Sequence, residues 1–340
     1  MLIWISSLFS SDLLATTVRV NNTLATNKAN KIYASLQEAH DDGTNVTNGD
    51  TLLVDGTNIV YAGLTSTKKL VIIGPGYLLT ENPQSQANSL PAIVEGITFN
   101  PGSEGSILIG MTFSTNSSLH QPAIAADNIA IIRCYLTNGI RIISSINNLV
   151  ILQNFLLRYG ISVNSSLYSF GGVILKNNVL ADDISIEQYP NAPRIFTAVE
   201  HNNFLGDVKV QTNSFRSNII VNEDATVEVT SGGKDNNLVR TEQQLAQLPA
   251  ANGNQVYNET ALFVGPEGSD NSTDGQYRLK SNSPYLTAGY NGSEPGIFGG
   301  DEPYRLSGVP PIPTIYDIQG DVIGSRQDGL NITVKARVNQ

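Results

Sequence analysis

An asparagine-centred pattern recurs through the middle of the chain and constrains its fold more than any other feature. Each copy is a short β-rich run, then a polar residue that is usually Asn, then an aromatic or aliphatic residue. Counting from Cys134, the Asn position recurs after 20, 24, 25, 15 and 19 residues, which places Asn203 in the fourth copy. The copies are Ile131–Tyr135, Ile151–Phe155, Leu175–Val179, Glu200–Phe204, Phe215–Ile219 and Lys234–Leu238.

This spacing predicts a solenoid. A period of about 20–25 residues is too long for one hairpin and fits one turn of a parallel β-helix. Asn accepts the left-handed backbone of a tight bend, and its amide can hydrogen-bond to the Asn of the next coil. We therefore predict an all-β chain that forms a single right-handed parallel β-helix, with an N-terminal helical cap and an irregular C-terminal tail.

The expected organisation has three parts. Residues 1–17 are interpreted as a signal peptide, residues 18–305 as the β-helix with its cap, and residues 306–340 as a Pro-rich tail with a terminal strand. Ser35 and Glu38 have the spacing of a capping box, which predicts a helix over 35–42. Residues 329–338 alternate as a strand whose apolar side needs a partner, either the solenoid or a neighbouring molecule.

Composition excludes some classes of partner. The 340 residues carry a net charge of -10, which argues against nucleic acid or an anionic membrane as a main partner. Charged residues are only 15% of the chain, so Asn, Ser, Thr and Gly must cover most of the surface. Cys134 is the single cysteine, so no disulfide framework is expected, and we predict that it is buried in the Asn column.

The N-terminal segment Met1–Phe9 is apolar and has the length of a secretory hydrophobic region. It lacks a basic leader, so a buried first strand is the alternative interpretation. We favour export, and with it a secreted or cell-surface location. No other stretch is long and apolar enough to span a membrane.

Motifs at both ends of the chain carry a family resemblance. They are Ser35–Ala39 (SLQEA), Gly49–Leu52 (GDTL), Tyr61–Gly63, Tyr277–Pro284, Ala288-Gly289 and Pro295–Gly300. Over residues 31–305 the chain resembles exported bacterial right-handed parallel β-helix proteins, including the chondroitinase-B and alginate-lyase type of polysaccharide lyase. It departs from their pattern where Thr287 replaces an Asp and Pro295-Gly296-Ile297 replaces Asp-Ile-Gly. The resemblance implies the architecture and does not by itself supply a reaction.

Three charged residues are the candidate catalytic group. Lys176, His201 and Arg216 lie two positions before the aligned Asn column, so coils in register would stack them. A lyase acting on uronic-acid glycans needs a base and a cation that neutralises the carboxylate; Lys176 or His201 could serve as base and Arg216 as cation. The resemblance invites this role, but its residue contexts do not match here. The favoured interpretation is that these charges occupy coil corners because corners face water.

One segment has the beginning of a calcium loop. Asp270, Ser272 and Asp274 place oxygen donors at alternate positions before Gly275, but the terminal acid of such a loop is absent. Calcium is therefore the only cofactor considered, and a plain turn is the favoured interpretation.

Aromatic residues are more suggestive of carbohydrate binding than the charges are. Tyr159, Tyr168 and Tyr189 fall in turns between the central coils, where their rings could stack on sugars. Phe113, Tyr135, Phe155 and Phe204 occupy fixed repeat positions, which favours packing in the core or at corners.

These features together favour a non-catalytic extracellular protein. We expect a structural scaffold that self-assembles through its C-terminal strand, or a glycan-binding adhesin. The alternatives are a polysaccharide lyase and a passive member of a larger secreted complex. The expected partners are thus a polysaccharide or a second copy of this chain.

Overall fold

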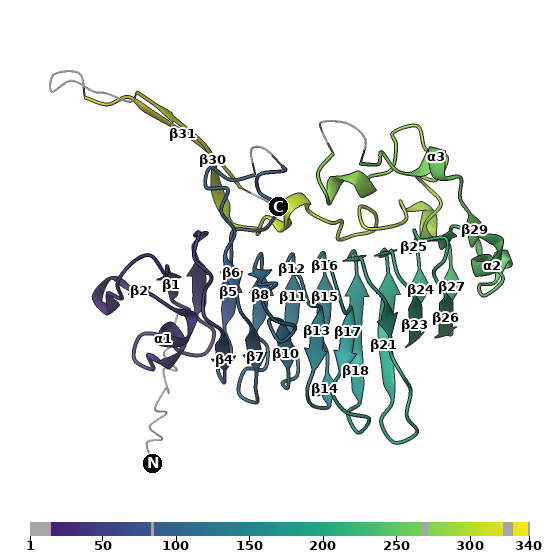
Figure 1. Ribbon diagram of the computed structural model, residues 1–340, viewed down its shortest axis with the longest axis horizontal. Coiled ribbons are helices and arrows are strands. Elements are labelled where there is room, and N and C mark those ends of the chain that lie inside the picture. Colours follow the sequence, from purple (N-terminus) through teal and green to yellow (C-terminus); the bar gives the residue numbers. More distant parts are fainter. Residues whose placement is uncertain (1–14, 83–84, 267–270, 322–328, 339–340) are drawn as a thin grey trace, which may run out of the picture.

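The computed structural model describes residues 15–82, 85–266, 271–321 and 329–338. In these residues, short parallel strands stack along one axis to form an elongated body of successive coils (Figure 1). The prediction of an all-β parallel β-helix is therefore confirmed. The described helices are short: α1 (Leu36–Asp41), α2 (Glu242–Leu245) and α3 (Glu259–Leu262).

Three parallel sheets make up the body. The long sheet contains β1 (Thr17–Val20), β2 (Ile32–Tyr33), β3 (Thr51–Val54), β5 (Val71–Ile73), β8 (Ile107–Ile109), β11 (Ala130–Ile132), β14 (Ile146–Asn147), β15 (Val150–Leu152), β18 (Phe170–Lys176), β20 (Ile184–Ser185), β21 (Arg194–Glu200), β23 (Val208–Thr212), β24 (Phe215–Arg216), β26 (Val227–Ser231) and β27 (Lys234–Asp235). The nine-stranded sheet contains β6 (Ile93–Val94), β9 (Thr112–Phe113), β12 (Tyr135–Leu136), β16 (Phe155–Leu156), β19 (Val179–Leu180), β22 (Asn203–Phe204), β25 (Ile219–Ile220), β28 (Leu238–Val239) and β29 (Gln255–Val256). The five-stranded sheet contains β4 (Leu64–Ser66), β7 (Ile97–Phe99), β10 (Pro122–Ile124), β13 (Ile140–Ile142) and β17 (Ile161–Val163).

The core consists of columns of apolar side chains, and each coil contributes several of them. Ile151 pairs with Leu175, and Leu175 with Val199, so the same inward position repeats along the axis. These three side chains have no exposed surface. Burying each stabilises the fold by roughly 1.5–3 kcal/mol, and the sum over coils makes the solenoid one continuous core.

An asparagine ladder closes the bend between the long sheet and the nine-stranded sheet. The amide oxygen of Asn178 accepts from the backbone N–H of Asn154 at 2.9 Å and from its Nδ2 at 3.0 Å. The same geometry links each further pair along the ladder, which runs Asn154, Asn178, Asn202, Asn218, Asn237 and Asn254. Cys134 begins it as predicted: its N–H donates to Asn154, it is buried, and burial raises the pKa of its thiol to about 12.

One rung of the ladder differs from the sequence alignment. The ladder residue is Asn202, whereas the spacing had placed Asn203 there. The alignment put Glu200 in the first, inward position of its copy, but Val199 occupies that position in the structure. Because burying Val199 costs nothing and burying a carboxylate costs a great deal, the coil takes the register one residue earlier.

The residue just before Cys134, and the one before each ladder Asn from Asn154 to Asn237, has a left-handed backbone. These residues, the αL column, are Arg133, Gln153, Asn177, His201, Ser217 and Asn236, with φ between 53° and 58°. A left-handed residue other than Gly costs roughly 1–2 kcal/mol. The bend therefore points one polar side chain per coil outward, next to the buried ladder.

The αL column holds the C-terminal segment 288–309, called the strap here, against the coils. Asn177 donates to the carbonyls of Ile297 at 2.9 Å and Gly299 at 2.8 Å. Four other αL residues bond the strap backbone in turn: Asn236 to Ala288, Ser217 to Tyr290, Gln153 to Glu302 and Pro303, and Arg133 to Val309. The strap thus runs back along the body, against the direction of coil stacking (Figure 1). The three parallel sheets end at Val256. The described residues of 257–305, which lie within the range 18–305 assigned to the β-helix, form this strap, a short helix and other irregular segments.

Beyond the strap, two antiparallel strands form a hairpin that projects from the body (Figure 1). They are β30 (Pro313–Gly320) and β31 (Ile332–Val338). Every residue of β31 is exposed. The predicted terminal strand therefore exists, and within this chain its strand partner is β30.

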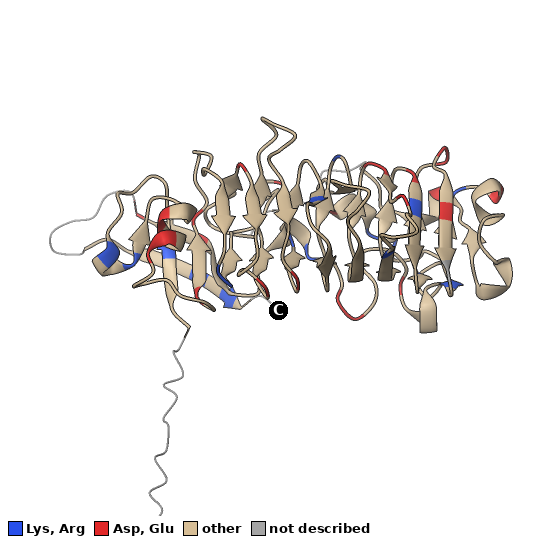
Figure 2. Ribbon diagram, turned by 90° about the horizontal axis from the view of Figure 1, so that it is seen from below, with Lys and Arg blue, Asp and Glu red and all other residues tan. Residues whose placement is uncertain are grey.

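The N-terminal cap forms as expected. Ser35 accepts the N–H of Glu38 at 3.1 Å, while the Glu38 carboxylate accepts the hydroxyl of Thr26 and does not return to the cap. The proposed signal peptide lies almost entirely outside the described residues. None of the described helices has the length and hydropathy needed to cross a lipid bilayer. Figure 2 shows charged residues sparsely scattered along the body, as the composition requires.

Candidate functional site

The one-residue shift at Asn202 changes the predicted catalytic line. The long-sheet residue that stacks between Lys176 and Arg216 is Glu200, because Lys176 pairs with Glu200 and Glu200 with Arg216. Arg216 in turn pairs with Asp235. His201 instead belongs to the αL column. The structure therefore gives a row of alternating charges, the charge ladder Lys176, Glu200, Arg216 and Asp235.

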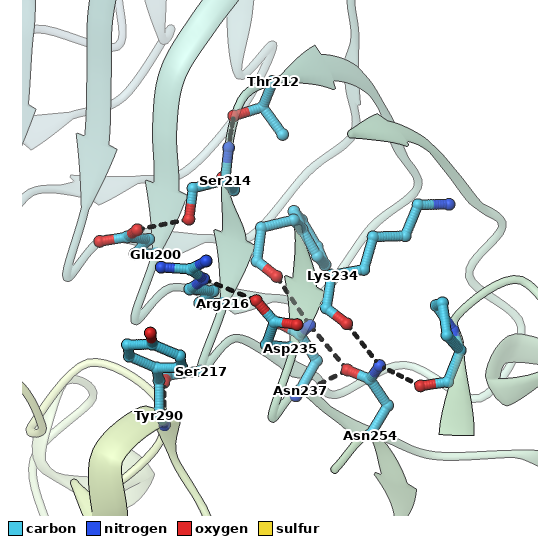
Figure 3. Close-up of polar contacts among 12 residues, drawn as sticks. Glu200, Thr212, Ser214, Arg216, Ser217, Lys234, Asp235, Asn237, Asn254 and Tyr290 are labelled. Atoms are coloured by element: carbon cyan, nitrogen blue, oxygen red, sulfur yellow. Dashed lines mark hydrogen bonds and ion pairs between the residues drawn. The ribbon is translucent and has the colours of Figure 1, made fainter. Parts of the chain in front are cut away.

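Each cation of the charge ladder is neutralised by an acid of the next coil. Lys176 Nζ lies 2.7 Å from Glu200 Oε2. Arg216 Nε lies 2.7 Å from Asp235 Oδ2 (Figure 3). Burial raises the pKa of Glu200, but hydrogen bonds from Lys176 and Ser214 outweigh it and hold that pKa below its ordinary value. The guanidinium of Arg216 also lies 4.2 Å from the ring centroid of Tyr290.

His201 is packed beneath the strap. Its Nδ1 is buried and has no hydrogen-bond partner among the described residues. A Cβ added to Gly300 would lie 3.0 Å from the ring, so glycine lets the strap pass over it. Burial lowers the pKa of His201, against the opposing charge of Glu200. Burial beneath the strap thus favours the neutral form of the imidazole.

The charge ladder and the strap enclose a groove of about 630 Å³. Lys176, Glu200 and Arg216 form one wall, and the strap residues Asp301 and Glu302 line the other. Apart from His201, its charged side chains are three acids and two cations. A polyanion gains little from such a lining.

This geometry does not favour the lyase chemistry considered from the sequence. A uronate carboxylate needs a cation that is not already paired, and both Lys176 and Arg216 are held by acids. A base needs access to the substrate proton, whereas Nδ1 of His201 is buried. The predicted residues do come together, but as a structural network.

A second hollow brings two of the three predicted tyrosines together. Tyr159 and Tyr189 line a concavity of about 400 Å³, called the tyrosine hollow here. Asp183, Glu187 and Arg194 also line it, together with the hydroxyls of Ser162, Ser166 and Ser185. Tyr168 is absent from this lining. Sequence reasoning selected the tyrosines but missed the acids and serines, which come from other turns and strands.

Tyr159 has an unusual backbone. Its φ is 59° and its side chain is 56% exposed. A left-handed conformation is strained for a bulky residue, and such strain persists only where the surroundings impose it. Here the N–H of Tyr159 donates to Asp182 at 2.9 Å, and Gly160 follows with φ 39°. The bend therefore presents the Tyr159 ring to solvent at a conformational cost.

Arg194 fixes the opposite side of the tyrosine hollow. Its side chain is buried, and its guanidinium donates to the carbonyls of Ser165, Tyr168 and Glu187. It also lies 4.9 Å from the ring centroid of Tyr189, whose hydroxyl donates to Glu187. The hydrogen bond to Glu187 raises the pKa of Tyr189. Tyr189 is therefore held in place, while Tyr168 contributes through its backbone.

The described residues of the predicted calcium loop make structural hydrogen bonds within the protein. Asp270 lies outside the described residues. Asp274 is fully buried, and its carboxylate accepts from Asn82 at 3.0 Å, Ser272 at 2.7 Å and the N–H of Ser307 at 2.7 Å. Protein donors thus already occupy these oxygens. In the part of the chain that the structure describes, no three His, Cys, Asp or Glu side chains are grouped as metal ligands.

The chain was compared with models of protein families, with curated proteins and with solved structures, and none of them matches it. The site must therefore be interpreted from its own geometry.

Proposed function

We propose that this chain is a non-catalytic, exported β-helix protein that binds carbohydrate in the tyrosine hollow. The observation that carries the proposal is the convergence of Tyr159 and Tyr189 on one concavity, with Tyr159 held exposed by a strained backbone. Aromatic rings stack on the apolar faces of sugars, and an exposed ring in a costly conformation is a better candidate for binding than for packing.

The polar lining of the hollow suits a sugar. Ser162, Ser166 and Ser185 place exposed hydroxyls around the two rings, where they can exchange hydrogen bonds with sugar hydroxyls. Asp183 and Glu187 add acceptor oxygens, and the charge of Arg194 is buried beneath them. The exposed charges of this lining are negative, which favours neutral or amino sugars over uronic acids, because the carboxylate of a uronic acid would face like charges.

The proposal is tested by titrating the full chain with three sets of oligosaccharides: neutral sugars, amino sugars and uronic-acid sugars. We expect binding to the first or second set. Tyr159→Ala and Tyr189→Ala should each weaken it about tenfold, which corresponds to about 1.4 kcal/mol of stacking.

Tyr168→Ala is the matched control, because its ring does not line the hollow and its carbonyl bond to Arg194 is retained. Binding that survives both hollow variants, or the absence of binding in all three sets, contradicts the proposal. Release of unsaturated product from uronic-acid glycans would support the lyase alternative instead.

A further inference from the structure

The C-terminal hairpin has one apolar face and one polar face. Cross-strand partners project to the same side of a sheet. The apolar face, called the arm face here, follows from the pairs Pro313–Val338, Ile315–Ala336, Ile318–Val334 and Gly320–Ile332. The opposite face follows from Thr314–Arg337, Asp317–Lys335 and Gln319–Thr333. The register shift between Ile315 and Asp317 brings Ile315 and Ile318 to the same side.

The arm face is uncovered. Ile318 is 58% exposed, Val334 50% and Val338 71%. The polar face, by contrast, pairs its own charges, with Lys335 2.8 Å from Asp317. An isolated two-stranded hairpin is marginal in water, and exposed contiguous apolar surface marks an interaction site. A molecule that binds the hairpin is therefore expected to contact its apolar face.

Four further exposed apolar side chains lie on loops that hydrogen bonds connect to the base of the hairpin. Leu24, Ile59, Val60 and Leu90, called the base patch here, are 41%, 50%, 37% and 42% exposed. They lie on segments tied by hydrogen bonds from Asn22 to the carbonyl of Ile59 and from Asn88 to that of Gly56. The same loop reaches the hairpin, because the N–H of Ala87 donates to Ile315 at 2.8 Å.

We propose that two copies of this chain associate by laying the arm face of each on the base patch of the other. The chain carries both surfaces of such a contact, so a second copy supplies what each lacks. In each copy the base patch adjoins the base of the hairpin. A two-fold axis that sets the two hairpins antiparallel therefore places the arm face of each copy on the base patch of the other at the same time. The interface is then isologous and closed.

The expected area favours two reciprocal contacts over one. Seven residues of two paired strands cover about 24 Å by 10 Å, or about 240 Å². Two hairpins stacked only on each other would bury about 500 Å² in total, below the roughly 1,000 Å² of a stable interface. A reciprocal exchange buries two arm faces and two base patches. With patches of about the same size as the arm face, the total is about 960 Å², close to that limit, which predicts a weak, concentration-dependent dimer.

The test is sedimentation velocity of the full chain from about 1 to about 200 µM. We expect a monomer–dimer equilibrium that strengthens with salt, because each copy carries a net charge of -10 and the contact is apolar. The arm variant Ile332→Thr/Val334→Thr keeps β-branched residues, and the patch variant is Ile59→Asn. Each should raise the dimer dissociation constant at least tenfold. Thr333→Gln, on the polar face, is the control.

Mixing the arm variant with the patch variant separates reciprocal exchange from other contacts. Only the mixed dimer contains one intact arm face on one intact patch, so mixing should restore part of the association. A monomer at every concentration, or a dimer insensitive to Ile59→Asn, overturns the proposal. So does a monomer that floats with phosphatidylcholine vesicles. The inference is independent of the tyrosine hollow, so either proposal can fail alone.

Discussion

The strap and the hairpin are consecutive parts of the same C-terminal tail, but they differ in how much they contact the body. The strap bonds five residues of the αL column and passes closely over the sixth, His201. The hairpin projects with its arm face exposed. Hydrogen bonds to the αL column, together with the packing of Ile297 and Tyr304 against Phe155 and Val179, hold the irregular strap on the coils. The comparison teaches that apolar surface left outside such contacts calls for another molecule.

The largest loss of stability is expected from a substitution where the strap is most crowded. A Cβ on Gly299 would lie 1.6 Å from the carbonyl oxygen of Glu294, so Gly299→Ala must displace the strap. We expect a loss of about 3 kcal/mol in the free energy of unfolding, measured by urea denaturation. Gly292→Ala meets no atom within 4 Å and should cost only about 1 kcal/mol of backbone strain. Equal losses for the two variants would mean that crowding within the strap is unimportant.

The second-largest loss of stability is expected when the hydrogen bonds of the αL column are removed. Asn177→Gly keeps the left-handed backbone but removes the donors to Ile297 and Gly299. Two lost hydrogen bonds predict a decrease of about 2 kcal/mol in the free energy of unfolding. Asn148→Gly is the matched control, since Asn148 is also left-handed but exposed and away from the strap. An Asn177 variant as stable as this control would show that the strap does not depend on these hydrogen bonds.

The strap should also be sensitive to pH. Burial lowers the pKa of His201, so the unfolded chain binds its proton first as pH falls. The stability that neutral His201 contributes is therefore present above the ordinary value of 6.5 and is lost as pH falls below it towards the folded pKa. We expect a smaller effect here, of about 1 kcal/mol or less, because the site is only partly shielded from solvent.

Two neighbouring acids complicate that pH dependence. Burial raises the pKa of Glu294 in the strap, while bonds from Lys176 and Ser214 lower that of Glu200. The informative quantity is thus the difference between the native chain and His201→Gln, followed from pH 8 to pH 5. Parallel stability curves for the two proteins would show that His201 does not titrate beneath the strap.

The smallest effect is expected on the hairpin. Ile332→Thr/Val334→Thr alters exposed side chains, so the free energy of unfolding of the dilute monomer should change by less than about 0.5 kcal/mol. Thermal unfolding at low protein concentration measures it. A large loss would mean that the arm face already packs on its own body.

The sequence predicted the repeating part of the molecule better than its tail. The Asn spacing is local, so the ladder and the burial of Cys134 could be inferred. The exception is Asn202, because two adjacent asparagines satisfy the pattern equally well. The inward position of Val199 decides between them, and the charge of Glu200 in the aligned position was the available signal.

The site was less accessible to sequence reasoning. Stacking of Lys176 and Arg216 was foreseen, but their partners Glu200 and Asp235 depend on the correct register. The strap is held by pairs far apart in the chain, such as Arg133 and Val309, which no spacing rule connects. The sequence shows that the residues of the αL column are polar. That they bind the strap follows only from the structure, in which the strap lies beside them.

The most direct test of the account is native-state hydrogen exchange at two protein concentrations. The amides of Tyr290 and Gly296, which donate to Ser217, should exchange slowly at both concentrations. Amides of β31 should exchange fast in the dilute monomer and become protected only when the chain associates. Fast exchange in the strap, or a hairpin equally protected at low concentration, would contradict it.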